Sequence, residues 1–239
     1  MLSKNKISYP KLDGFRTVRV KFRKVGNLQY ISHLDLQRTI SRVLVRAGIP
    51  MWYTQGFNPH AKIVFGLPLS VGAESECEYL DLRIDRDMPC DEIKERLNAV
   101  LTDELCVLDV YEAPKSAFAD IVWARYDIRI RTEGLTQELV NEAQTYLTTS
   151  PLMMDKKSKS GIRPVDITTL IRSLDATLAD GELRLDTVLC VSGADYLNPE
   201  YLIRALREKF GILPEGDVVS EYTVLRTKVY LSDGETEFK

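Results

Sequence analysis

The sequence predicts an α+β protein built from two tandem ferredoxin-like βαββαβ units with antiparallel sheets. Three observations lead to this prediction: an alternating strand with a basic face near the start, an amphipathic helix after it, and a second strand of the same kind after residue 120. The 239 residues are enough for two small domains, and 44% hydrophobic residues can fill their cores. We therefore expect one unit at residues 1–116 and another at 117–239.

The first unit begins with residues 17–24, which read TVRVKFRK. Apolar and basic side chains alternate along this segment, as in a strand with one buried and one wet face. The cations expected to face water are Arg19, Lys21 and Arg23. Helices are expected where apolar residues recur on one side, at 31–47 and 90–101. Short apolar or alternating segments predict strands at 51–53, 62–65, 78–84 and 105–111.

The second unit begins at residue 121 and repeats the pattern. Its first strand again alternates apolar with charged residues, and the cations expected to face water are Arg125, Arg129 and Arg131. A helix is predicted at 136–147 and another at 199–210, with Gly211 at its end. A lysine-rich loop and a short apolar segment, 165–174, follow the first helix; strands are predicted at 176–179, 183–191 and 218–231. Each first strand is expected inside its own sheet.

Composition and cysteine spacing exclude several classes of protein. The four cysteines are widely spaced without a C-x-x-C pair, so neither a zinc site nor a disulfide framework is indicated. The CxxxCxxC run of a radical S-adenosylmethionine enzyme is missing. The sequence lacks a run of about 18 apolar residues, and its lysine-containing start is unlike an apolar signal segment. We therefore expect a cytoplasmic protein without a cofactor, a metal or a membrane partner.

The first segment that can carry chemistry is SHLDLQR, at the start of the first predicted helix. Ser32 and Asp35 have the spacing of a capping box, which satisfies the amides exposed at a helix start. His33 meets the positive end of the helix dipole, which favours its neutral form and makes it a candidate base. Arg38 lies farther along on a polar side, where it could reach a phosphate.

The second segment is the loop at residues 53–62, which is dense in Gly, Pro, amide and aromatic residues. A plain connection between strands needs fewer such residues, and loops of this composition often bind ligands. Its candidate binding residues are Gln55, Asn58 and Lys62, with His60 as a second candidate catalytic residue. The alternative is a structured loop held by its own amide hydrogen bonds.

The third segment is the lysine-rich run at residues 156–167. Its cations lie beside flexible Ser and Gly residues, which would suit a phosphate backbone. The alternative is a loop that is simply solvated. The residues concerned are Lys156, Lys157, Lys159 and Arg163.

These segments resemble those of a bacterial family. Over residues 17–112, the tracts VRVKFRKVG, SHLDLQR and QGFNPH, with Lys62 and Pro68-Leu69, are similar to hallmark segments of the uncharacterised bacterial proteins described as radical SAM-linked. In the second half only the lysine-rich run and the following Val-Asp-Ile are similar, and Ala61 stands where the family pattern has proline. The resemblance implies a bacterial, cytoplasmic protein associated with a radical SAM partner, and it implies no particular reaction.

Three functions are compatible with these observations. The first is an RNA-binding or RNA-modification accessory protein that works with a radical SAM partner; because the net charge is −3, RNA would be bound through a local basic face. The second is an interaction module that docks on a radical SAM protein without nucleic acid. The third is a metal-independent endoribonuclease in which His33 and His60 act as base and acid.

Overall fold

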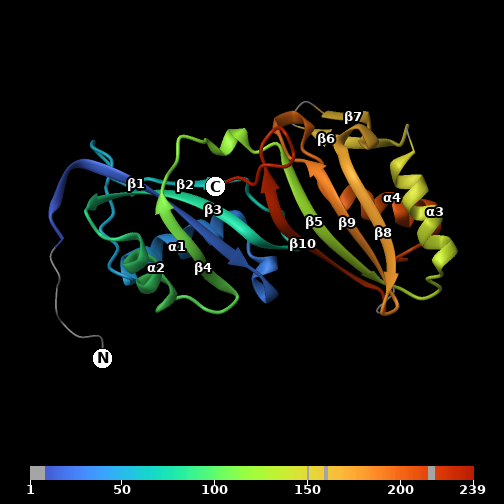
Figure 1. The fold of residues 1–239 in the computed structure, drawn as a ribbon, viewed down its shortest axis with the longest axis horizontal. Helices are drawn as coiled ribbons and strands as arrows, with labels where there is room; N and C mark the ends of the chain where they lie inside the picture. The colour runs from blue at the N-terminus through green and yellow to red at the C-terminus, as the bar shows by residue number, and fades with distance from the viewer. Residues whose placement is uncertain (1–8, 150, 159–160, 215–218) are drawn as a thin grey trace. The chain divides into compact units, whose positions relative to one another are not determined.

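The computed structural model describes residues 9–149, 151–158, 161–214 and 219–239 as a mixed α+β protein with four α-helices and mostly antiparallel strands (Figure 1). The chain divides into two compact units. The first takes residues up to 71 and 77–116, and the second takes 72–76 and 117–239. Within the described ranges, no helix is long and apolar enough to cross a membrane.

The first unit has four strands and two helices. Its strands are hydrogen-bonded in the order β4-β1-β3, with β2 beside β3, and the β1–β4 and β2–β3 pairs are antiparallel. In chain order the elements are β1 (Lys11–Lys24), α1 (His33–Arg46), β2 (Ile63–Gly66), β3 (Ala73–Arg86), α2 (Cys90–Asn98) and β4 (Leu105–Glu112). This is the predicted order of strands and helices, except that the strand expected at residues 51–53 is reduced to isolated bridges at Met51 and Tyr53.

The core of the first unit lies against one face of its strands. Val18, Val20 and Phe22 of β1 are buried, as their alternation predicts. They belong to one cluster with apolar residues of both helices, among them Leu36, Ile40, Leu44, Ile93 and Leu97. Helix α1 starts at His33, two residues after the predicted start, because the Ser32 side chain caps it by accepting a hydrogen bond from the Asp35 N–H.

The second unit contains two helices and six strands of its own. Four strands are hydrogen-bonded in the order β10-β5-β9-β8, and each neighbouring pair is antiparallel. The remaining two, β6 and β7, form a separate antiparallel pair. In chain order the elements are β5 (Trp123–Arg131), α3 (Gln137–Thr148), β6 (Met153–Ser158), β7 (Gly161–Asp166), β8 (Ile171–Ala179), β9 (Glu182–Cys190), α4 (Glu200–Phe210) and β10 (Glu221–Tyr230).

Strand β3 serves both units. Its first residues belong to the second unit, where Ala73–Ser75 pair in parallel with Val224–Arg226 of β10. Its later residues pair with β2 in the first unit. The sequence predicted only residues 78–84 as this strand and a separate sheet for each half. Both expectations are wrong. Strand β3 starts at Ala73, where polar residues such as Ser75 are buried, and it is hydrogen-bonded to β10 as well as to β2.

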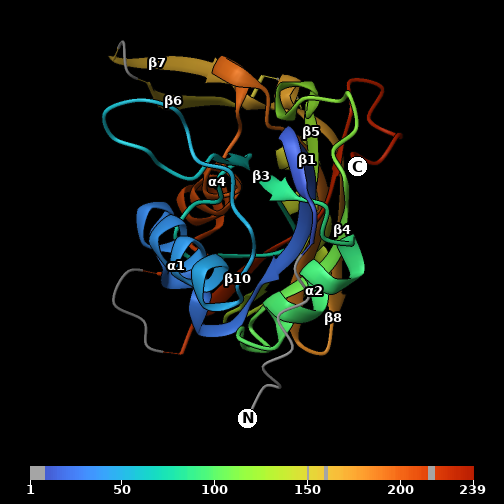
Figure 2. The same cartoon turned by 90° about the vertical axis from the view of Figure 1, so that its left-hand side faces the viewer.

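The lysine-rich segment was expected to be a loop, and this expectation is wrong for the residues around Lys156. They form the β6–β7 hairpin, whose strands run side by side in Figure 2. Period-two alternation explains the difference, because Met154 and Lys156 lie on the same, buried face of β6. The aliphatic stem of a lysine can occupy such a position.

Candidate nucleic-acid interface on the first unit

An arginine stacked on two aromatic rings lies at the surface of the first unit. The guanidinium carbon of Arg83 is 4.0 Å from the centroid of the Phe15 ring and 5.4 Å from that of Trp52. The two rings are themselves 5.0 Å apart and tilted by 54°. Phe15 is exposed, whereas Trp52 and Arg83 are half-buried. The cluster therefore places the exposed Phe15 ring beside a cation at the surface.

Backbone pairing brings these residues together. Arg83 follows the buried Leu82 on β3, so its side chain points away from the helices. The N–H of Trp52 donates to the Arg83 carbonyl at 2.8 Å, and the N–H of Arg83 donates to the Lys62 carbonyl at 3.2 Å. Lys62 lies directly opposite Arg83 in the register that pairs Ile63 with Leu82. Side chains of opposite residues share a face, which places a second cation beside Arg83.

The loop at residues 54–60 is closed at its base by Thr54 and His60. The Thr54 N–H donates to the His60 carbonyl at 3.0 Å, and the His60 N–H donates to the Thr54 hydroxyl oxygen at 3.2 Å. Between them Gln55, Phe57 and Asn58 are exposed, and the Phe57 ring is fully exposed. We call this loop, together with Phe15, Trp52, Lys62 and Arg83, the Arg83 surface.

The charges of the Arg83 surface are not balanced by ion pairs. Among the residues that the structure describes, neither Arg83 nor Lys62 has a carboxylate within salt-bridge distance. Asp81 on the same strand is already bound by Arg19, and Asp85 is the carboxylate that shares the outward face of β3 with Arg83. Two cations therefore remain available to an anion.

The two histidines are held by different partners. The Nε2 atom of His33 lies 2.8 Å from the Gln37 amide, and its ring meets Phe65 edge-on at 5.4 Å. The Nδ1 atom of His60 lies 3.1 Å from the Thr54 hydroxyl and 3.3 Å from the Asn58 carbonyl. These contacts fix the two rings separately, and the action of His33 and His60 as a base and an acid on one phosphate stays a prediction.

Arg38 is engaged within its own helix. Its guanidinium forms an ion pair with Asp35 at 3.1 Å, where both side chains are more than half exposed. Hydrogen bonds from Ser32 and Arg38 hold the pKa of Asp35 below its ordinary value. These contacts agree with the capping interpretation of the SHLDLQR segment.

The cations of β1 do not form the predicted wet face, and for Arg19 that prediction is wrong. The Arg19 side chain is buried, with its Nε atom 2.7 Å from one Asp81 oxygen and its Nη2 atom 2.9 Å from the other. It also donates to the Ser116 carbonyl at 2.9 Å. Arg23 donates to the Asp103 carbonyl, and the Lys21 ammonium lies 5.7 Å from the centroid of the Tyr79 ring. Asp81 and Ser116 contact the Arg19 guanidinium, so its charge is paired although the side chain is buried.

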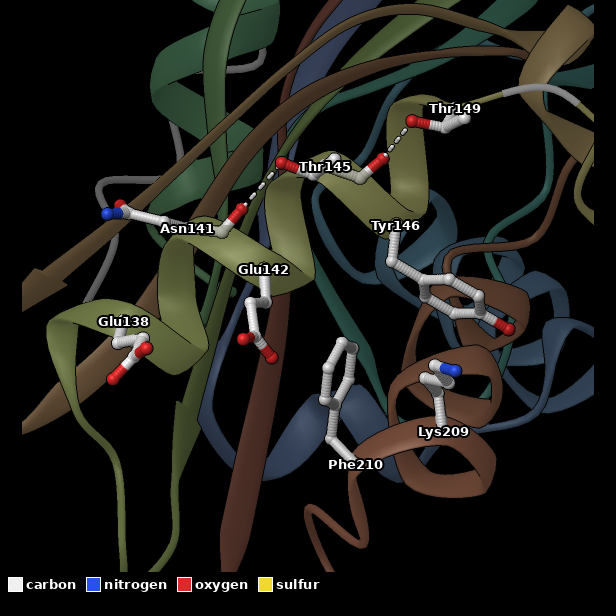
Figure 3. Close-up of a pocket in the computed structure, with 8 residues that line it drawn as sticks. All are labelled: Glu138, Asn141, Glu142, Thr145, Tyr146, Thr149, Lys209 and Phe210. Carbon is white, nitrogen blue, oxygen red and sulfur yellow. Dashed lines mark hydrogen bonds between the residues drawn. The ribbon is translucent and has the colours of Figure 1, made fainter.

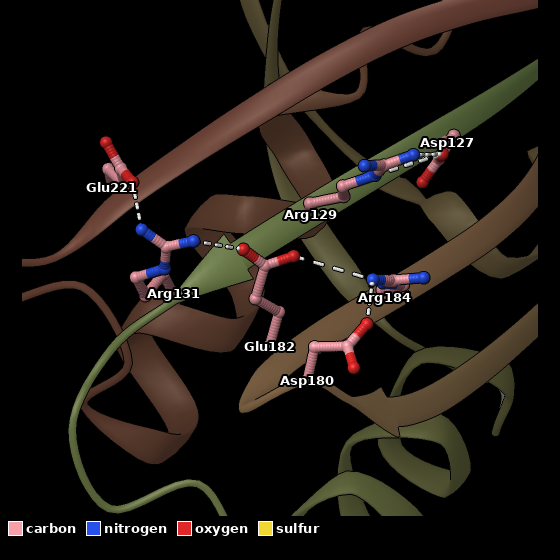
Figure 4. Close-up of polar contacts among 7 residues, drawn as sticks. All are labelled: Asp127, Arg129, Arg131, Asp180, Glu182, Arg184 and Glu221. Atoms are coloured by element: carbon pink, nitrogen blue, oxygen red, sulfur yellow. Dashed lines mark hydrogen bonds and ion pairs between the residues drawn. The ribbon is translucent and has the colours of Figure 1, made fainter.

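The cations of β5 face solvent as predicted, but each is paired with a carboxylate. Arg131 contacts Glu182 at 2.7 Å and Glu221 at 3.0 Å, and Arg129 contacts Asp127 at 2.8 Å (Figure 4). Arg125 forms a two-pronged pair with Asp186, which raises the pKa of the guanidinium. This face of the second unit is charged but locally neutralised.

The lysine-rich segment contributes less surface than expected. Lys156 is buried, and burial lowers the pKa of its ammonium group. Arg163 lies directly across from it on β7 and is exposed. Lys159 lies outside the described residues, as does the side chain of Lys157.

Sequence reasoning missed Phe15, Trp52 and Arg83. Arg83 could have been identified as a surface cation, since it occupies an outward position of the alternating segment 78–84. Phe15 lies before the predicted first strand, and the structure extends that strand back to Lys11. The contact between residues so far apart in the chain is set by strand pairing, which alternation alone does not specify.

The chain belongs to a family described as uncharacterised proteins conserved in bacteria, DUF2344, whose model matches residues 17–199. No curated protein matches the chain. Two solved structures each cover 89% of this chain and 98% of their own at 10% identity. One is an unknown protein from Galdieria sulphuraria, with a TM-score of 0.26, and the other a presumed glycine cleavage system transcriptional repressor, with a TM-score of 0.23. Scores this low carry no argument about function.

Proposed function

We propose that the chain is an RNA-binding or RNA-modification accessory protein that holds a single-stranded segment on the Arg83 surface. The carrying observation is the Arg83 guanidinium, stacked on two rings and not ion-paired among the described residues. Single-stranded nucleic acids bind proteins that combine aromatic platforms with cations along the backbone. The Phe15 and Phe57 rings are exposed for stacking, and Lys62 lies where it can meet a phosphate.

The exposed loop gives this surface a means of reading bases. Gln55 and Asn58 present amide donors and acceptors at its tip, and unstacked bases of RNA are recognised through such groups. The contrast with the second unit supports the choice of surface. Cations that already have carboxylate partners must break those pairs before they bind phosphate, whereas Arg83 and Lys62 need not.

The test is fluorescence anisotropy with a labelled 12-nucleotide single-stranded RNA of mixed sequence, titrated at several salt concentrations. Replacing Phe15 or Phe57 by Ala should weaken binding by about 1–3 kcal/mol for each base that stacks. Arg83→Ala should weaken binding and also reduce the slope of log affinity against log salt by about 1.

Arg46→Ala is the matched control. It removes the same charge from an exposed position of α1, a helix that packs on the core face of the strands. Its affinity and salt slope should equal those of the unchanged protein. Binding that is undetectable, independent of salt, or lost equally in Arg46→Ala and Arg83→Ala would contradict the proposal.

We further interpret both units as ferredoxin-like. The order β4-β1-β3-β2 and the order β10-β5-β9-β8 correspond strand for strand when the β6–β7 hairpin is set aside. We also propose a cytoplasmic role beside a radical SAM protein, supported by the resemblance of the SHLDLQR and QGFNPH segments. Co-purification of the tagged chain from its bacterial host tests this: a radical SAM protein should be enriched, and its absence from the purified material would count against the association.

A further inference from the structure

A groove lies between the two helices of the second unit, separate from the Arg83 surface. It encloses about 770 Å³, within the usual range of ligand sites. Helix α3 lines one wall and the end of α4 lines the other (Figure 3). Its lining residues are Glu138, Asn141, Glu142, Thr145, Tyr146, Thr149, Lys209 and Phe210. We call it the α3–α4 groove.

The floor of the groove is aromatic. The Tyr146 and Phe210 rings meet edge-on with their centroids 5.7 Å apart, and both side chains are half-buried. The Lys209 ammonium lies 5.8 Å from the centroid of the Tyr146 ring. This contact shows that a ring of the floor already accepts a cation on its face.

The rim formed by α3 carries two carboxylates that have no ion-pair partner among the described residues. Glu138 and Glu142 are exposed, and their four-residue spacing puts them on one face of the helix. Neither carboxylate has a hydrogen bond or an ion pair among the described residues. Like charges at this spacing destabilise a helix, and a bound cation would relieve the repulsion. Figure 3 shows Glu142 pointing toward the Phe210 ring.

We propose that the α3–α4 groove docks a basic segment of a protein partner, with an arginine held between the carboxylates and the Phe210 ring. An arginine fits both features, because its guanidinium stacks on aromatic rings and pairs with carboxylates through its planar fork of donors. An aliphatic neighbour of that arginine would cover the Tyr146 ring. Nucleic acid is disfavoured here, since Glu138 and Glu142 repel phosphate. The inference does not depend on RNA binding at the Arg83 surface.

The test uses a labelled, acetylated 14-residue helical peptide with two arginines four residues apart and leucines beside them. Fluorescence anisotropy should give binding that weakens at least fivefold in the double variant Glu138→Gln/Glu142→Gln. Phe210→Ala should weaken it to a similar degree. Glutamine keeps the size and helix preference of glutamate, so the double variant isolates the charge.

Glu133→Gln is the matched control, because it removes an exposed carboxylate just before α3 that does not line the groove. It should bind the peptide as the unchanged protein does. A peptide with glutamate in place of both arginines should not bind. Equal binding of both peptides, or unchanged binding in the double variant, would overturn the inference, as would a single-stranded RNA that binds here and is displaced by the peptide. Failure of RNA binding at the Arg83 surface would leave these outcomes unaltered.

Discussion

At the scale of single residues, what distinguishes one cation from another is its partner. Arg83 is stacked on rings, Arg19 is bound by a carboxylate, and Arg131 is bound by two. All three are arginines that directly follow a buried apolar residue of a strand. The charge available to a ligand therefore depends on neighbours that only the fold supplies.

Asp85 gives a directional test of this view. It shares the outward face of β3 with Arg83, so its negative charge should repel a phosphate bound there. Asp85→Asn is expected to tighten single-stranded RNA binding by severalfold at low salt, with a smaller gain at high salt because screening weakens the repulsion. Anisotropy titrations at two salt concentrations measure the effect. Weaker binding in the variant would show that phosphate lies elsewhere.

Lys156 gives a prediction about pH. Because burial lowers its pKa in the folded state from the ordinary value of 10.5, the unfolded chain binds this proton more tightly. The charged Lys156 therefore lowers the free energy of unfolding at pH values below its folded-state pKa. This destabilisation disappears as the pH rises toward 10.5. Lys156→Met should raise the free energy of unfolding at pH 7, and its advantage should shrink as pH increases. Denaturant unfolding at pH 7 and pH 10 provides the comparison; an advantage that does not change with pH would argue against this account.

At the scale of elements, the Arg19–Asp81 pair links β1 to β3. Arg19 is buried and Asp81 is mostly buried, so removing the cation leaves a carboxylate that is partly removed from water. Arg19→Met should lower the free energy of unfolding by about 3 kcal/mol. Adding Asp81→Asn to that variant should restore part of the loss, because the unpaired charge is then gone.

Arg131→Met is the control for this prediction. Its side chain is 59% exposed, its partner Glu221 is 66% exposed, and its other partner Glu182 keeps an ion pair with Arg184, so the loss of Arg131 should cost less than about 1 kcal/mol. Urea unfolding of the variants, followed by circular dichroism, measures both effects. If Arg19→Met and Arg131→Met lower the free energy of unfolding equally, burial does not determine how much an ion pair contributes to stability.

The elements themselves were largely predictable from local signals. The alternation of β1 predicted its buried face, Ser32 predicted the start of α1, and Gly211 predicted the end of α4, where it adopts a left-handed conformation. The β6–β7 hairpin was not predicted, since lysines suggest a solvated loop and the burial of Lys156 depends on what packs against it. Stacking of Arg83 on Phe15 and Trp52 is likewise set by non-local pairing.

At the scale of the whole molecule, a net charge of −3 hides an uneven distribution. On β5 of the second unit the arginines are paired with carboxylates, whereas the Arg83 surface has cations and the α3–α4 groove has carboxylates without ion pairs among the described residues. Charges of opposite sign that remain available in different places suit a protein that contacts two chemically different ligands. Neither surface could be found from composition, because local counter-ions decide which charges remain.

The β6–β7 hairpin is closed at its base by hydrogen bonds. The Ile167 N–H donates to the Leu152 carbonyl at 3.0 Å, and an Asp166 carboxylate oxygen accepts from the Leu152 N–H at 3.0 Å. Because the two ends meet, α3 and β8 need not shift when the segment between them grows or shrinks. A change in the length of the hairpin should therefore leave the pairing of the surrounding strands intact.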